Sequence, residues 1–75
     1  MYYLIKESSI NELRKKFVTG GVGINYRDPS ITMRHIVHNK EDALVFDTIE
    51  DASQFLCHGY VIATEVEENV FKIVN

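Results

Sequence analysis

Apolar side chains fall into short stretches that are separated by polar and glycine-containing segments. Residues 2–6 and residues 31–38 are rich in aromatic and β-branched side chains, which is typical of strands. Residues 43–46 are continuously apolar, and this pattern predicts a central strand of a sheet. The polar residues 39–42 lie between the second and third stretches, so they predict a hairpin turn that joins two strands.

A different spacing follows the first of these stretches. Residues 10–17 carry large apolar side chains three and four positions apart, which predicts one face of a helix. Ser9 and Glu12 fit a capping box, in which the serine accepts a hydrogen bond from a backbone amide and the glutamate reaches back. Gly20 and Gly21 predict the end of this helix, because glycine adopts the left-handed conformation that closes many helices.

The second half of the chain predicts another helix and a pair of strands. Thr48 and Asp51 have the spacing of a helix N-cap, and apolar residues follow at helical spacing until Gly59. Residues 60–64 and 70–74 are β-branched stretches on either side of a polar turn, and they predict a terminal hairpin.

The order of these elements predicts an α+β fold in one domain, residues 1–75. A ferredoxin-like βαββαβ two-layer sandwich with an extra C-terminal strand is the simplest solution. In it, two helices with one apolar face each cover the same face of an antiparallel sheet. A looser α+β arrangement, in which residues 19–30 add a strand, is the alternative.

The composition is that of a small globular domain. The chain has 75 residues, of which 45% are hydrophobic and 25% are charged, and it has one cysteine. A single cysteine cannot form an internal disulfide, and no apolar run approaches the roughly 18–20 residues that a transmembrane helix needs. The first residues have neither the basic region nor the cleavage pattern of a secretory signal. We therefore expect a cytoplasmic protein without a membrane partner.

Charge is unevenly distributed along the chain. Residues 1–40 hold seven basic and three acidic side chains, whereas residues 41–75 hold one basic and eight acidic side chains. This asymmetry predicts either two surfaces of opposite sign or two halves that lie against each other and partly neutralise.

The residue types that catalyse reactions or bind metals do not occur in productive patterns. His35 and His38 would point to opposite faces of a strand, so they should not share an ion. Cys57 lies near the end of a predicted helix, where the helix dipole opposes a thiolate. The glycines of residues 20–23 follow a helix instead of preceding one, so no aligned dipole favours a phosphate there. We expect no enzymatic activity, no metal site and no cofactor.

Two interaction hypotheses follow from the charges. The first is a non-enzymatic protein-binding module whose acidic face contacts a partner through Glu41, Asp42, Glu65, Glu67 and Glu68. The same module could instead dock through the basic face of the first predicted helix, Arg14, Lys15 and Lys16. The alternative from a different class is a small domain that binds single-stranded RNA or DNA through Tyr3, Arg27 and Arg34. The net charge of −3 favours the first hypothesis over direct nucleic-acid binding. An open edge strand, above all the last one, offers a further contact through which a homodimer could form.

A resemblance to known proteins concerns the segment from Ala43 to Leu56, ALVFDTIEDASQFL, and the strand-rich end at residues 60–74. It resembles a pattern in small uncharacterised accessory proteins of phages and mobile elements of Gram-positive bacteria, in which a strand ending in Phe-x-Thr leads into a helix. Such proteins often bind and inhibit a host or defence protein, and anti-CRISPR inhibitors are among them. The resemblance thus implies a partner that handles nucleic acid, such as a CRISPR effector nuclease, in the cytoplasm of a bacterial host.

Overall fold

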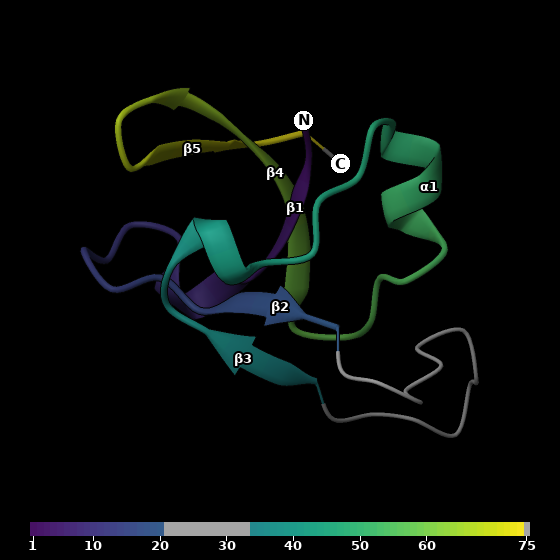
Figure 1. Ribbon diagram of the computed structural model, residues 1–75, viewed down its shortest axis with the longest axis horizontal. Helices are drawn as coiled ribbons and strands as arrows, with labels where there is room; N and C mark the ends of the chain where they lie inside the picture. Colours follow the sequence, from purple (N-terminus) through teal and green to yellow (C-terminus); the bar gives the residue numbers. More distant parts are fainter. Residues whose placement is uncertain (21–33, 75) are drawn as a thin grey trace.

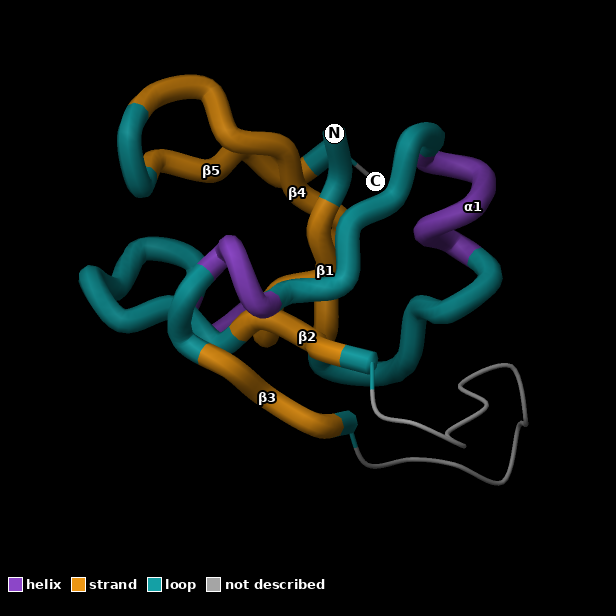
Figure 2. Tube along the Cα trace, viewed as in Figure 1, coloured by secondary structure: helices purple, strands orange, loops and turns teal. Residues whose placement is uncertain are grey.

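The computed structural model describes residues 1–20 and 34–74, and these form one antiparallel sheet with short helical segments around it (Figures 1 and 2). In chain order the elements are β1 (Tyr3–Lys6), the 3-10 helix η1 (Glu7–Ser9), β2 (Phe17–Thr19), β3 (His35–Val37), the 3-10 helix η2 (Lys40–Asp42), α1 (Ile49–Ser53), β4 (Tyr60–Glu67) and β5 (Val70–Ile73). The sheet has the strand order β3-β2-β1-β4-β5, so the first strand lies at its centre.

Both faces of the sheet bury apolar side chains, because neighbouring residues of a strand point to opposite faces. Leu4 on β1 belongs to one cluster, which α1 and the segment before it cover on the right of Figure 1. The buried members of this cluster are Leu4, Val18, Phe46, Ala52 and Ile62. The neighbouring Ile5 belongs to a second cluster on the other face, whose buried members are Ile5, Phe17, Ala63 and Phe71.

The second cluster lies inside a strongly curled sheet. Phe17 is on β2 and Phe71 is on β5, and two strands separate them in the sheet order. In a flat sheet such positions would be about 14 Å apart, yet the two ring centroids are 5.3 Å apart. The ring of Tyr3 contacts both of them edge to face. We call this side the concave face of the sheet.

The predicted helix over residues 10–17 is wrong. Phe17 is a strand residue that pairs with Ile5 and is buried, whereas Leu13 is 92% exposed in the loop between β1 and β2. Ser9 does not cap a helix: its Oγ donates to the carbonyl oxygen of Lys6 at 2.8 Å and accepts from the amide of Lys16 at 3.0 Å. A helix of two turns has little stability of its own, so the burial of one large aromatic side chain in the curled sheet outweighs it.

The prediction of a central strand at residues 43–46 is also wrong. β3 pairs with β2 instead, and the predicted hairpin turn is the 3-10 helix η2. The extended segment after η2 contacts the sheet at separate points: Leu44 donates its amide to Val18 O at 2.9 Å, and Phe46 forms an isolated bridge with Tyr2. The continuous apolar run therefore reflects a segment packed over the sheet. Its residue Phe46 is buried there.

Other predictions are confirmed. The first strand and the terminal hairpin are present, and β3 lies within the predicted strand at 31–38, of which residues 31–33 are outside the described part. Thr48 caps α1, because its Oγ1 accepts from the amide of Asp51 at 3.0 Å. The helix ends at Ser53, however, and does not continue to Gly59.

The fold is α+β with an antiparallel sheet, but the described residues do not form the ferredoxin-like arrangement. That arrangement needs two helices on one sheet face, and the first of them is replaced by a loop and β2. The alternative strand at residues 19–30 lies outside the described residues, apart from Thr19 at the end of β2 and Gly20. Among the described helices, none has the length and apolar character needed to cross a bilayer.

Candidate functional site

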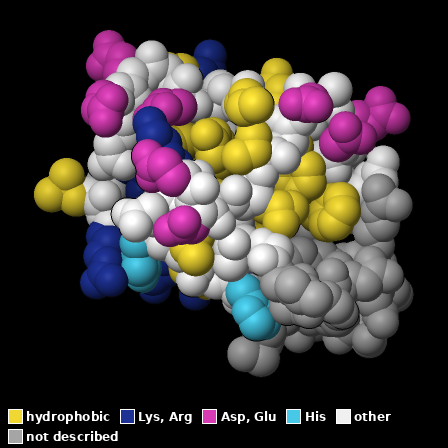
Figure 3. Space-filling view, in the orientation of Figure 1, with side chains coloured by type: hydrophobic (Ala, Val, Ile, Leu, Met, Phe, Trp, Pro, Cys, Tyr) yellow, Lys and Arg dark blue, Asp and Glu magenta, His cyan; other side chains and the backbone are white. Residues whose placement is uncertain are grey.

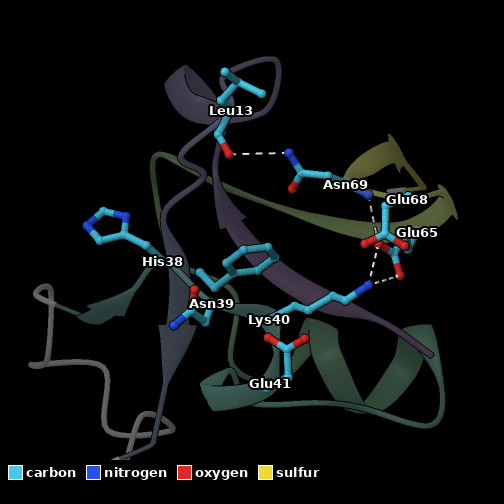
Figure 4. Close-up of a pocket in the computed structure, with 9 residues that line it drawn as sticks. Leu13, His38, Asn39, Lys40, Glu41, Glu65, Glu68 and Asn69 are labelled. Atoms are coloured by element: carbon cyan, nitrogen blue, oxygen red, sulfur yellow. Dashed lines mark hydrogen bonds and ion pairs between the residues drawn. The ribbon is translucent and has the colours of Figure 1, made fainter.

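Three of the five predicted acidic residues line one pocket of about 250 Å³ at the open end of the concave face (Figure 4). Glu41 reaches it from η2, Glu65 from β4, and Glu68 from the turn between β4 and β5. We call it the acidic pocket. Its lining consists of Leu13, Phe17, His38, Asn39, Lys40, Glu41, Glu65, Glu68 and Asn69.

The fold positions these carboxylates through ordinary strand geometry. Glu65 lies opposite Phe71 in the β4–β5 pair, so it shares the concave face with that ring and with Ala63 two residues earlier. The register between β4 and β5 then shifts between Glu65 and Glu67. This irregularity ends the regular alternation of faces where the strand leaves the core, and Glu68 follows in the turn.

An ion pair between Lys40 and Glu65 lines the acidic pocket (Figure 4). The Lys40 Nζ lies 2.7 Å from Glu65 Oε2 and 2.8 Å from Glu65 Oε1. The backbone amide of Asn69 donates to the same carboxylate at 3.0 Å. The hydrogen bond to Glu65 holds the pKa of Lys40 above its ordinary value, and the charges of Glu65, Glu68 and Glu41 act in the same direction. The bond from Lys40, followed by the one from the Asn69 amide, holds the pKa of Glu65 below its ordinary value.

The pocket keeps a negative charge after this pairing. Lys40 supplies one ammonium against the three carboxylates of Glu41, Glu65 and Glu68, and the side chains of Lys40 and Glu65 are still 30% and 25% exposed. Partly exposed carboxylates attract the charged end of a basic side chain, and the apolar floor beside them can contact the alkyl part of that side chain. The arrangement is therefore suited to a lysine or arginine side chain from another molecule.

Leu13 forms the apolar rim of the pocket. Its side chain is 92% exposed, and its carbonyl oxygen accepts from Asn69 Nδ2 at 3.3 Å, which ties the β1–β2 loop to the β4–β5 turn (Figure 4). The helical spacing of residues 10–17 predicts that Leu13 is buried, so the sequence does not indicate its place at the surface. Lys40 is not among the residues predicted for the acidic face, and Asn69 is not among the predicted site residues. Asn69 adopts a positive φ of 59°, which asparagine tolerates in a turn.

The other two predicted acidic residues do not line the pocket. Asp42 is exposed, and its backbone oxygen accepts from Thr19 Oγ1 at 2.7 Å, so its contribution to the structure comes from its main chain. Glu67 is exposed at the end of β4. On the face shown in Figure 3, acidic side chains gather in two groups, one on the side of the β4–β5 hairpin and one over α1, where Glu50 and Asp51 are exposed.

Among the described residues, those predicted for the basic and aromatic face do not form one surface. The ring of Tyr3, a half-buried residue, is packed edge to face against two phenylalanines on the concave face. Arg34 donates from Nη2 to Phe55 O at 3.2 Å, and Phe55 packs against the cluster on the opposite face. Of the remaining members, Arg14 is exposed, Lys16 is half-buried, Lys15 is buried and Arg27 lies outside the described residues.

Other reactive side chains are scattered. His35 and His58 are exposed, and His38 is exposed with its Nδ1 3.1 Å from Lys15 O. Cys57 is half-buried. Within residues 1–20 and 34–74, no three His, Cys, Asp or Glu side chains gather in a way that could hold a metal ion.

The acidic pocket is thus the site that best unites the predicted residues with the geometry. When the chain is compared with protein-family models, with curated proteins and with solved structures, it matches none of them.

Proposed function

We propose that the protein is a non-enzymatic protein-binding module that engages a partner through the acidic pocket. The observation that carries this proposal is the convergence of Glu41, from η2, with Glu65 and Glu68, from the β4–β5 hairpin, around Lys40. The exposed Leu13 beside them adds an apolar contact. A charged depression with an apolar rim supports recognition of a basic segment, because opposite potentials guide encounter and apolar contacts retain the complex.

The partner in this proposal is a host or defence protein that handles nucleic acid. Such proteins carry lysine and arginine side chains in the channels that bind phosphates, and an acidic surface can occupy the same channel. The protein then acts as a phage-type inhibitor in the cytoplasm of a bacterial host, with a CRISPR effector nuclease as one possible target. This proposal rests on the charge of the site together with the resemblance of residues 43–56 to accessory proteins of phages.

Charge reversal tests the proposal. The variant pair Glu41→Lys and Glu68→Lys changes the pocket, while Asp47→Lys and Glu50→Lys make the same change of net charge near α1. Proteins captured from a nuclease-treated host lysate are compared for the wild type and both double variants, and association rates of a captured partner are measured against salt. We expect the pocket variant to lose the partner and the α1 variant to keep it.

Two outcomes would contradict the proposal. One is a partner that both double variants bind equally well, with an association rate that does not fall as ionic strength rises. The other is tight binding of a fluorescently labelled single-stranded DNA or RNA at low salt by the wild type and by the pocket variant alike, which would favour direct nucleic-acid binding.

A further inference from the structure

Lys15 is a buried cation without a counter-ion among the described residues. Only 4% of the residue is exposed. No carboxylate lies within 4.0 Å of its Nζ in residues 1–20 and 34–74, where the recorded ion pair joins Lys40 and Glu65 instead. Lysine is almost never fully buried unless it is paired, because removing the charge from water is costly.

The contacts that Lys15 does make account for only part of its bonding capacity. Its Nζ donates to Glu12 O at 2.6 Å and lies 5.9 Å from the centroid of the Phe71 ring. An ammonium has three donors, and a cation 6 Å from a ring is at the outer limit of a useful cation–π contact. Within residues 1–20 and 34–74, one neutral acceptor and one distant ring leave two donors and the positive charge without a matched partner.

A small pocket lies beside this side chain and shares Asn69 with the acidic pocket. It measures about 130 Å³ and is lined by Ile10, Asn11, Lys15, Asn69, Val70 and Phe71. Three of these residues, Asn11, Asn69 and Val70, are exposed, so the pocket opens to solvent. Its lining combines apolar side chains with Lys15, Asn11 and Asn69, of which Asn69 already donates one side-chain hydrogen bond to Leu13 O.

We infer that this second pocket binds a carboxylate group through Lys15. A carboxylate accepts several hydrogen bonds and carries one negative charge, which equals the single charge that Lys15 offers. A phosphate dianion fits less well, because its second negative charge is repelled by the carboxylate of Glu65. That carboxylate lies close by, since it accepts a hydrogen bond from the backbone amide of Asn69, the residue common to both pockets. The inference does not depend on the proposed function, which concerns the acidic pocket.

A titration followed by nuclear magnetic resonance tests the inference on the full chain. The ¹⁵N-labelled protein is titrated with sodium acetate up to about 100 mM, a range that covers millimolar affinities, with sodium chloride at equal ionic strength as the control. We expect saturable shifts of the backbone amides of Asn11, Lys15 and Asn69 with acetate and not with chloride. No saturable shift, or equal shifts with both salts, would overturn the inference.

Two variants separate binding from folding. Lys15→Met keeps the length of the side chain and removes the charge, so we expect acetate to bind about tenfold more weakly or worse. Without acetate, its melting temperature should be equal to or above that of the wild type, because an apolar chain replaces a buried unpaired charge. If Lys15→Met unfolds, the existing contacts of Lys15 satisfy its charge and the inference fails. Asn11→Ala, at an exposed position, should fold and weaken acetate binding severalfold.

The source of the carboxylate is distinguished with small probes. N-acetylglycine presents a carboxylate at the end of a peptide unit, and N-acetylglycinamide is its uncharged match. Tighter binding of N-acetylglycine than of acetate indicates the carboxylate of a polypeptide, and tighter binding of acetate indicates a free small acid. Equal shifts with the amide, or stronger binding of phosphate than of either acid, would contradict recognition of a carboxylate.

Discussion

Lys40 and Glu65, whose charged atoms are 2.7 Å apart, connect the two ends of the curled sheet. Lys40 follows the edge strand β3, while Glu65 is on β4 beside the opposite edge strand, so two strands lie between these positions in the sheet order. Their contact exists only because the sheet curls, and it places the acidic pocket at the opening that the curl leaves. The ion pair is therefore a property of the tertiary fold and not of either segment alone.

The stability of the protein should fall in acid partly through Glu65. The pKa of this carboxyl is lowered in the folded state, so its contribution is fully present above its ordinary pKa of about 4.3 and is lost as the pH falls through the folded value. Lys40, whose pKa is raised, contributes below its ordinary pKa of about 10.4 and loses that contribution as the pH rises through the folded value.

Thermal unfolding of Glu65→Gln at pH 7 and pH 3 checks this acid dependence. We expect the variant to melt below the wild type at pH 7 and the gap to narrow at pH 3, because protonation then removes the charge from the wild type as well. Glu67→Gln, exposed on the same strand, is the matched control and should melt like the wild type at both values. A gap at pH 3 as large as at pH 7 would contradict the assignment.

Truncation to alanine should lower the stability of the protein strongly at Phe17 and hardly at all at Leu13. Phe17 is 2% exposed, and its replacement by alanine removes the centre of the aromatic cluster, which costs about 3–5 kcal/mol. This equals the whole stability expected of a domain of this size, so Phe17→Ala should be largely unfolded. Leu13 is 92% exposed, so Leu13→Ala should change the unfolding free energy by less than about 0.5 kcal/mol. Circular dichroism and urea unfolding measure both effects. Equally severe losses of stability would favour the helix that the sequence pattern predicts for residues 10–17.

The turn between β4 and β5 should tolerate glycine better than alanine. Asn69 has a φ of 59°, which costs roughly 1–2 kcal/mol for a residue with a β-carbon and no polar side chain to compensate. Asn69→Gly loses the side-chain bond to Leu13 but avoids this strain, so it should retain more stability than Asn69→Ala. Urea unfolding of both variants gives the difference, and an alanine variant as stable as the glycine variant would contradict the strained turn.

Local signals in the sequence predict the elements whose stability is local. The Thr48 cap, the first strand and the terminal hairpin depend on spacing, β-branched residues and turn residues within a few positions. The region from Ser9 to Phe17 has equally clear helical signals, yet Phe17 pairs with Val37, twenty residues away, and contacts the Phe71 ring of β5 edge to face. No window of the sequence contains those partners, so local reasoning assigns the wrong element.

Local sequence signals predict the acidic residues of the candidate site, but not the residues that tertiary contacts bring to it. The acidic character of the C-terminal half points to Glu65 and Glu68, because a hairpin turn brings acidic neighbours to one end of the sheet. Lys40 and Leu13 reach the acidic pocket only through the curl of the sheet and the loop between β1 and β2. Their roles are set by contacts between distant segments, which neither charge counting nor periodicity can supply.

Ser9 should matter more for folding than its neighbour Ser8. The Ser9 hydroxyl is buried, with 1% of the residue exposed, and it bridges the backbone of Lys6 and Lys16, thereby holding both ends of the β1–β2 loop. Ser9→Ala leaves a carbonyl and an amide without their partner and should cost about 1–3 kcal/mol. Ser8→Ala removes an exposed hydroxyl and should change stability by less than about 0.5 kcal/mol.

Urea unfolding of the two variants compares the same chemical change at adjacent positions. Equal losses would mean that the hydroxyl of Ser9 does not hold the loop. A large loss for Ser9→Ala alone would show that this loop depends on a buried side-chain bridge in place of the helix that the sequence pattern predicts.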